Sequence, residues 1–217
     1  MTRISASILA CNTAYLGETV INLEKAGADI LHVDVTDGHY VDNLTFGSLI
    51  VRDIRPLTKL PIEAHLGVYN PERYIRDFAD AGADIITVQM DCSVHPLRVF
   101  REIRSYGKKV GVAINPCQSI DEIKYFYKYI DYLSIMGVEP GFGGQAFEDI
   151  NYDKISKVKA LLKSLSHEIP IGVDGGINLQ NFELIKEAGA DILVIGTSLF
   201  SEQDMKDTIR KFKGVTV

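Results

Sequence analysis

The feature of this sequence that most restricts its fold is a short segment that occurs three times. It reads "AGADILHVD" from Ala26, "AGADIITVQ" from Ala81 and "AGADILVIG" from Ala188. In each copy a helical pattern ends at glycine, a short polar turn follows, and an apolar strand begins. The copies are irregularly spaced, which argues against a solenoid repeat. They indicate a repeated unit of helix and buried strand.

The same alternation of strand and helix continues along the chain. It predicts a parallel sheet, and eight such units in 217 residues suit a closed (β/α)8 TIM barrel with little decoration. We see no break in composition, so we expect a single domain over residues 1–217; an open doubly wound sheet is the alternative. We expect strands near residues 4–9, 30–35, 61–66, 84–89, 109–114, 132–136, 169–174 and 191–196, and helices near 14–26, 47–56, 71–81, 95–106, 119–129, 150–164, 179–188 and 202–212.

Polar residues lie at alternate positions of the strand expected at 30–35. His32, Asp34 and Thr36 share one face of it, and the residues between them are aliphatic, because side chains alternate between the two faces of a strand. A core does not accept such polar groups unpaired. In a barrel, the C-terminal ends of the strands form the mouth where active sites lie. We therefore expect His32 and Asp34 to belong to a site.

Two further strands end on residues of the same kinds, His65 and Asp174. Together with the first pair they form a set of two histidines and two carboxylates at the mouth, which suits one divalent Zn²⁺, Fe²⁺, Mn²⁺ or Co²⁺ ion per chain. A structural, hydrogen-bonded role is the alternative for each residue taken alone. His39, in the loop after the second strand, is a candidate for supporting these ligands, whereas His95 and His167 are expected near the surface or at helix ends.

Glycine-containing loops follow three adjacent strands. They read "EPGFGGQAF" at 139–147, "DGGIN" at 174–178 and "IGTSLF" at 195–200. Glycine lets backbone N–H groups approach an anion closely, and a short helix after the last strand would add its dipole. The loops after strands 7 and 8 are the usual phosphate position of this barrel. Turn formation alone is the simpler explanation for any one loop, but three in adjacent units predict a phosphorylated ligand.

The geometry of the barrel suggests a reaction. The strands that carry Asp34 and Asp174 stand nearly across the mouth from each other, so these carboxylates would flank a ligand from opposite faces. Two such carboxylates and a Lewis acid can remove a proton next to a carbonyl from one face and return one to the other. A metal-dependent aldolase-type lyase and a non-catalytic sugar-phosphate-binding barrel are the alternatives. The lyase needs one essential base, and the binder is expected to lose a ligand, so the sequence favours an epimerase.

The composition excludes several other classes of partner. The net charge is −6 with scattered basic residues, which argues against nucleic acid and against an anionic membrane surface. No run reaches the roughly 18 apolar residues of a membrane span. Three widely spaced cysteines, Cys11, Cys92 and Cys117, fit a reducing compartment better than a disulfide framework.

Over essentially its whole length the sequence resembles the ribulose-phosphate 3-epimerase family. The motifs that carry this resemblance are "SIL" at 7–9, "HVDVTDGHYVDNLTFG" at 32–47, "AHLGVYNPERYI" at 64–75, "INPCQSI" at 114–120, "MGVEPGFGGQAF" at 136–147, "VDGGIN" at 173–178 and "GADILVIGTSLF" at 189–200. The resemblance implies a cytosolic, usually oligomeric (β/α)8 enzyme that interconverts D-ribulose 5-phosphate and D-xylulose 5-phosphate.

The resemblance also implies roles for individual residues. Asp34 and Asp174 would be the acid–base pair, and His32, Asp34, His65 and Asp174 the metal ligands. The residues implied to hold the substrate are Ser7, His65, Gly141, Phe142, Gly143, Gly144, Asp174, Gly175, Gly176, Gly196 and Thr197.

The sequence departs from the family pattern at the mouth. Thr36 and Gly67 stand where methionines are common, Met136 remains, and Gln89 ends a strand that often ends with histidine. The methionines normally cap the enediolate and exclude water. Their loss opens space and adds a hydroxyl, so the preferred sugar could be another pentulose, a tetrulose or a hexulose phosphate, or the change could be drift.

Overall fold

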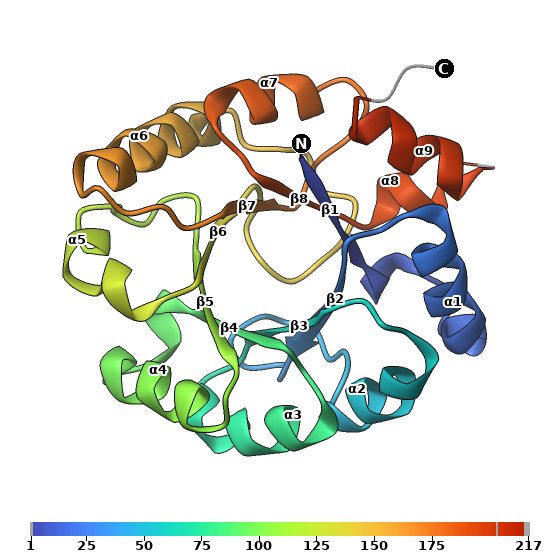
Figure 1. Cartoon of the computed structure of the whole chain (residues 1–217), viewed down its shortest axis with the longest axis horizontal. Helices are drawn as coiled ribbons and strands as arrows, with labels where there is room; N and C mark the ends of the chain where they lie inside the picture. The colour runs from blue at the N-terminus through green and yellow to red at the C-terminus, as the bar shows by residue number, and fades with distance from the viewer. Residues whose placement is uncertain (1, 203, 215–217) are drawn as a thin grey trace.

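Eight parallel strands close into a barrel in the order of the chain, β1 to β8, with β8 paired to β1 (Figure 1). The computed structural model describes residues 2–202 and 204–214; Gln203, in the helix expected at 202–212, and residues 1 and 215–217 of the expected domain lie outside the described residues. The closed barrel confirms the predicted fold and excludes the open sheet. The strands are β1 Arg3–Ser7, β2 Ile30–Thr36, β3 Ile62–Gly67, β4 Ile85–Gln89, β5 Lys109–Ile114, β6 Tyr132–Met136, β7 Ile171–Asp174 and β8 Ile192–Ile195.

Helices surround this barrel (Figure 1). They are α1 Leu16–Ala26, α2 Ser48–Ile54, α3 Ile75–Ala81, α4 Pro96–Ser105, α5 Ile123–Phe126, α6 Ile150–Ser164, α7 Phe182–Ala188, α8 Thr197–Phe200 and α9 Met205–Phe212. The short helix α8, directly after β8, is the helix start expected there.

Several expected elements are shorter than predicted, and two of them illustrate the physical reason. The first strand ends at Ser7 rather than at residue 9, because the Ser7 hydroxyl accepts the Leu9 N–H and begins a 3-10 turn, Ile8–Ala10. The helix expected at 119–129 is α5 followed by a 3-10 turn, Tyr127–Tyr129. Its aromatic residues have weak intrinsic helix propensity, which explains the short helix.

The repeated "AGAD" segments join each helix to the next strand in the same way. Gly27, Gly82 and Gly189 all have positive φ (95°, 102° and 122°) and end helices α1, α3 and α7. The aspartate that follows accepts the N–H at or near the start of the preceding strand, as Asp84 does from Ile62 at 2.8 Å. Asp29 and Asp191 do the same for Ile4 and Ile171. The repeat therefore links the N-terminal ends of adjacent strands by hydrogen bonds from the backbone to the aspartate.

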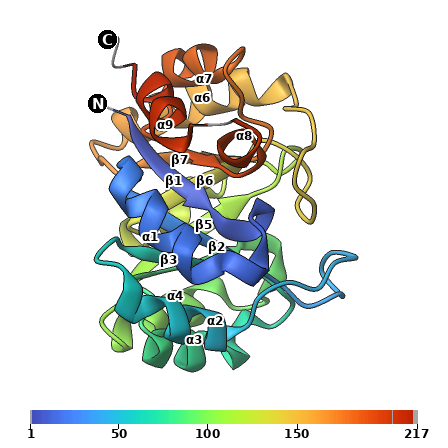
Figure 2. The ribbon, with the colours of Figure 1, turned by 90° about the vertical axis from the view of Figure 1, so that its right-hand side faces the viewer.

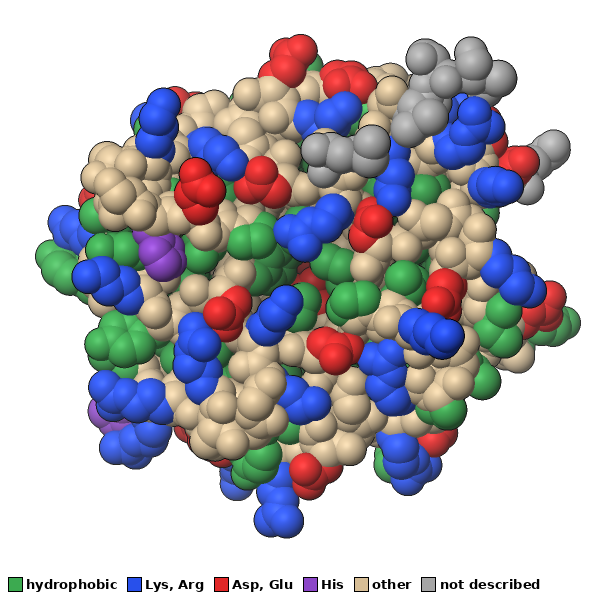
Figure 3. Space-filling model, viewed as in Figure 1, with side chains coloured by type: hydrophobic (Ala, Val, Ile, Leu, Met, Phe, Trp, Pro, Cys, Tyr) green, Lys and Arg blue, Asp and Glu red, His purple; other side chains and the backbone are tan. Residues whose placement is uncertain are grey.

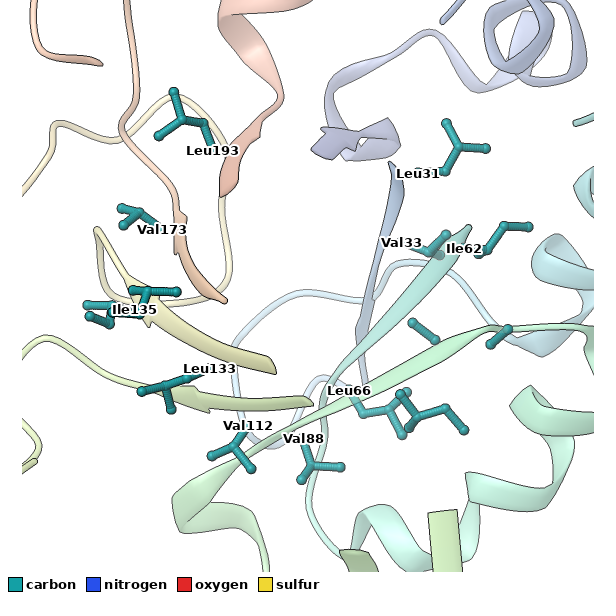
Figure 4. Packing of buried hydrophobic residues seen from close by; sticks show 14 of the residues in the cluster. Leu31, Val33, Ile62, Leu66, Val88, Val112, Leu133, Ile135, Val173 and Leu193 are labelled. Atoms are coloured by element: carbon teal, nitrogen blue, oxygen red, sulfur yellow. The ribbon is translucent and has the colours of Figure 1, made fainter. Parts of the chain in front are cut away.

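The two faces of each strand have different surroundings. Aliphatic side chains such as Leu31, Val33, Leu66 and Val112 point away from the barrel axis and pack in the main core against the helices (Figure 4). Inside the barrel, Ile30, Ile85, Tyr132 and Ile192, one from each of four alternate strands, form a separate apolar cluster. Polar side chains follow them toward the C-terminal ends of the strands. This layering by alternate strands is typical of the fold.

The two ends of the barrel differ as well. In Figure 2 the N-terminus lies at one end, and the loop after β2, residues 37–47, projects at the other. Figures 1 and 3 show the N-terminal end, where charged side chains of both signs are interspersed. Two aspartates of the "AGAD" segments form salt bridges at this end, Asp191 with Lys159 and Asp84 with Arg55. The site described next opens at the opposite end.

Candidate active site

Four side chains from three strands converge at the C-terminal end of the barrel. His32 Nε2 lies 3.1 Å from Asp34 Oδ1 and 3.4 Å from Asp174 Oδ2. His65 Nδ1 lies 3.3 Å from Asp174 Oδ2 and 3.7 Å from Asp34 Oδ1. These side chains come from β2, β3 and β7, so closure of the barrel brings together residues that are up to 142 positions apart (from 32 to 174).

This cluster has the chemistry of a cation site. The four ligand atoms lie within 4.8 Å of one another. Asp174 Oδ2 is buried and makes no hydrogen bond to any described residue. Holding two carboxylates close together, one of them with an unsatisfied buried oxygen, costs free energy unless a positive charge lies between them. The residues therefore fit a divalent metal ion of the kind that nitrogen and oxygen ligands share.

The charges of the cluster shift the pKa values of His32, His65 and Asp34. Burial alone would lower the pKa of His32, but Asp34, Glu63 and Asp174 raise it well above its ordinary value. Burial opposes the same shift at His65, but the nearby carboxylates of Asp174 and Asp34 raise its pKa to about 9. The histidines in turn outweigh burial at Asp34 and hold its pKa well below the ordinary range. The four residues therefore behave as one electrostatic unit.

A cavity of about 240 Å³ opens above this cluster. This volume is just below the usual range for ligand pockets, about 300–1,000 Å³, and suits a small ligand such as a sugar phosphate. His32 is fully buried beneath it. All the residues expected to hold the substrate line it, namely Ser7, His65, Gly141, Phe142, Gly143, Gly144, Asp174, Gly175, Gly176, Gly196 and Thr197.

The glycine loops form one side of this cavity at close range. Gly175 and Gly176 both have positive φ, and a Cβ on Gly176 would lie 2.6 Å from the backbone nitrogen of Phe147. The loop after β7 therefore packs directly on the loop after β6, with no room for a side chain. A hydrogen bond from Asn43 Nδ2 to the Gly141 carbonyl ties the loop after β2 to the same region.

The two unusual mouth residues, Thr36 and Gly67, both line the cavity. The Thr36 hydroxyl donates to the Asn43 carbonyl at 2.8 Å and lies 3.2 Å from Thr45 Oγ1. A Cβ on Gly67 would lie at ordinary contact distance, 3.7 Å, from the Tyr40 ring. Thr36 is thus engaged in holding the loop after β2, and Tyr40 borders the space beside Gly67.

Sequence reasoning was wrong about His39 and overlooked a buried acid. His39 is exposed and contacts Asp37 rather than a ligand of the cluster. Glu63 is fully buried, and its Oε2 lies 3.1 Å from His32 Nδ1. Gln89, known from the sequence as a departure from the pattern, places its amide 3.0 Å from His65 Nε2. The signal for Glu63 was its position two residues before His65, which puts both on the same strand face.

Within residues 2–202 and 204–214, no helix is long and apolar enough to cross a membrane.

Comparison with known sequences gives a consistent result. The model of the "Ribulose-phosphate 3 epimerase family" matches residues 3–200. The ribulose-phosphate 3-epimerase of Bacillus subtilis is 40% identical over 215 residues, covering 99% of both chains. The ribulose-5-phosphate-3-epimerase of Arabidopsis thaliana chloroplasts is 41% identical over 212 residues, 97% of this chain and 75% of that one.

Solved structures at low identity support the architecture. KGPDC from Streptococcus mutans has a TM-score of 0.75 at 14% identity and covers 99% of this chain and 97% of its own. A mutant tryptophan synthase α-subunit from Pyrococcus furiosus has a TM-score of 0.72 at 13% identity, with 98% and 97% covered. At such identity the likeness shows the barrel fold alone.

Proposed function

Because this chain belongs to the ribulose-phosphate 3-epimerase family, a family of isomerases that act on carbohydrates, we propose that it interconverts D-ribulose 5-phosphate and D-xylulose 5-phosphate. The observation that carries the proposal is the convergence of two carboxylates on the same pair of histidines. Asp34 and Asp174 reach them from β2 and β7, strands that are separated in the barrel by β1 and β8. The carboxylates thus approach the floor of the cavity from different sides.

The two carboxylates act as an acid–base pair. One carboxylate takes the C3 proton, and the electrons of that C–H bond pass into the C2 carbonyl to give an enediolate. The other carboxylic acid then gives its proton to the opposite face of C3. The histidines beside Asp34 outweigh its burial and hold its pKa well below the ordinary range, so the side chain is a carboxylate at neutral pH. Ser7 Oγ donates to Asp34 Oδ2 at 2.7 Å and fixes the orientation of this base.

His32, Asp34, His65 and Asp174 would hold one divalent ion per chain, Zn²⁺, Fe²⁺, Mn²⁺ or Co²⁺. Such an ion supplies a Lewis acid that stabilises the negative charge of the enediolate oxygens. His32 and His65 must be neutral to bind it, so loading the site releases the protons that their raised pKa values favour.

The phosphate group of the substrate binds at the glycine loops. Gly175, Gly176, Gly196 and Thr197 line the same side of the cavity after β7 and β8, the position that this fold uses for phosphate. Gly141 to Gly144 close that side from the loop after β6. This arrangement anchors one end of the sugar and leaves its C2 and C3 over the acid–base pair.

The contacts of Thr36 support a pentulose phosphate over another sugar. Its hydroxyl proton is donated to the Asn43 carbonyl in the loop after β2, so Thr36 has no proton left to donate to an extra sugar hydroxyl. The Tyr40 ring beside Gly67 supplies apolar surface where a methionine is common. Contacts within the chain thus account for both Thr36 and Gly67, and neither residue requires a different substrate.

Activity on a panel of ketose phosphates tests the proposal. The protein, loaded with each metal in turn, should epimerise ribulose 5-phosphate with a higher kcat/KM than tetrulose or hexulose phosphates. Asp34→Asn and Asp174→Asn should each lower kcat by about 10²–10⁴-fold, the usual contribution of an acid–base group, with metal content measured in both. Asp53→Asn, an exposed carboxylate paired with Arg52, is the control. Cleavage without epimerisation would favour the lyase, and binding without turnover the non-catalytic barrel.

We also propose that the protein is cytosolic and forms a homo-oligomer, as the family resemblance implies. Sedimentation of the metal-loaded protein would test the assembly.

A further inference from the structure

Glu63 is a buried carboxylate that the acid–base mechanism does not use. It lies on β3, opposite His32 in the register of β2 and β3, and is 0% exposed. Both of its oxygens have partners: Oε2 lies 3.1 Å from His32 Nδ1, and Oε1 accepts the Thr87 hydroxyl at 2.7 Å. Burying a carboxylate this completely costs free energy unless it is paired with a positive charge.

The position of Glu63 fixes which nitrogen of His32 faces the cluster. A neutral imidazole carries one N–H, and a carboxylate at Nδ1 holds the proton there. The lone pair of Nε2 then points at Asp34 Oδ1 and Asp174 Oδ2. This is the tautomer and the orientation in which His32 can bind a metal ion.

His65 has a neutral partner instead of a charged one. Its Nδ1 faces the cluster, and its Nε2 lies 3.0 Å from the amide of Gln89. Among the described residues, His32 is the one basic side chain within ion-pair distance of Glu63. The negative charge of Glu63 therefore acts on the cluster through the His32 ring and not through a lysine or arginine.

The surrounding chain makes room for this arrangement. A Cβ on Gly111 would lie 2.1 Å from Thr87 Oγ1, so the glycine on β5 leaves space for the hydroxyl that orients Glu63. Thr87 is itself fully buried. Three neighbouring strands, β3, β4 and β5, thus contribute one residue each to a fixed support beneath His32.

We propose that Glu63 is the positioning residue that sets the affinity of this site for its divalent ion, by holding His32 in the metal-binding tautomer and adding negative charge behind it. The proposal rests on the metal site proposed above. Carboxylate support of a metal-bound histidine is typically worth about 10- to 100-fold in metal affinity.

The test is the dissociation constant for Zn²⁺, measured by competition with a chromophoric chelator. Glu63→Gln keeps the size and the hydrogen-bonding atoms but removes the charge, and we expect its constant to rise about 10- to 100-fold. Glu24→Gln is the matched control, because Glu24 also accepts a threonine hydroxyl, from Thr58 at 2.7 Å, but outside the barrel. Its constant should equal that of the wild type.

The outcomes separate this inference from the proposed function. A wild-type protein that binds no Zn²⁺ would contradict the proposed metal site. If the wild type binds Zn²⁺ and Glu63→Gln binds it with equal affinity, the proposed role of Glu63 is overturned. A lower melting temperature of the metal-free Glu63→Gln variant would not rescue the proposal, because that change alone indicates a structural role. Should Glu63→Gln fail to fold, Thr87→Val removes the support of Glu63 without touching its charge. It should weaken Zn²⁺ binding several-fold, and unchanged affinity would overturn the inference.

Discussion

At the scale of single residues, the histidines of the metal-free site stay protonated to a higher pH than ordinary histidines. Burial would lower the pKa of His65, but Asp174 and Asp34 raise it from 6.5 to about 9, and His32 is shifted in the same direction. A group whose pKa is higher in the folded state contributes stability that is complete below its unfolded pKa and is lost as the pH rises through its folded pKa. The relevant window is therefore from pH 6.5 to about 9.

We accordingly expect the melting temperature of the metal-free protein to fall across this window, by roughly 2–4 °C for each kcal/mol lost. Thermal unfolding followed by circular dichroism at several pH values measures it. The metal-loaded protein is the control, because its histidines are already neutral and should show a smaller fall. A metal-free melting temperature that rises over the same range would contradict the charges assigned here.

The four converging residues could be predicted from the sequence because each follows a simple rule. His32 and Asp34 alternate with aliphatic residues, and His65 and Asp174 end predicted strands. Glu63 could not be recognised in the same way. One acidic residue in an apolar strand is also typical of a surface edge. Its partner His32 lies on the neighbouring strand, so the contact depends on the register in which β2 and β3 pair.

At the scale of the elements, the loops after β6 and β7 depend on the absence of side chains. Gly176 has a φ of 71°, and a Cβ there would lie 2.6 Å from the backbone of Phe147. The backbone of Phe147 can move only at a high cost in free energy, so Gly176→Ala should displace the loop that we propose binds phosphate. We expect KM for ribulose 5-phosphate to rise at least about 10-fold, the effect of losing roughly 1.4 kcal/mol of binding.

Gly107→Ala is the matched control for this prediction. Gly107 has nearly the same φ, 70°, but nothing lies within 4 Å of its added Cβ. Steady-state kinetics should therefore show a normal KM for Gly107→Ala despite a similar backbone strain. An equal rise of KM in both variants would mean that strain, and not the contact with Phe147, causes the effect.

The order and type of the elements could be predicted better than their ends. The strand expected at 169–174 begins at Ile171, just after Pro170, which lacks a backbone N–H for the ladder. The expected strand at 4–9 ends at Ser7 because of the hydrogen bond that its side chain makes with Leu9. Such ends depend on local side-chain contacts that hydrophobic periodicity does not encode.

At the scale of the whole molecule, stability and chemistry lie at opposite ends of the barrel. At the N-terminal end, the "AGAD" aspartates stitch strands together, and Asp84 both accepts the Ile62 N–H and pairs with Arg55. Asp84→Ala should lower the free energy of unfolding by about 1.5–3 kcal/mol, the usual contribution of a hydrogen bond to a charged group. The kcat/KM of the folded variant should be unchanged. A loss of kcat/KM at a temperature where the variant is fully folded would contradict this separation.

The central claim is that two carboxylates exchange the C3 proton of a ketose phosphate across two faces of an enediolate. We propose that Asp34 and Asp174, on β2 and β7, are these two groups. The most direct test is to run the reaction from ribulose 5-phosphate in D₂O and to analyse the early product by NMR or mass spectrometry. We predict xylulose 5-phosphate with solvent deuterium at C3, because the proton that is delivered comes from the carboxyl group opposite the one that took the substrate hydrogen. Product that carries the substrate's own hydrogen at C3 would contradict the account and indicate a single base.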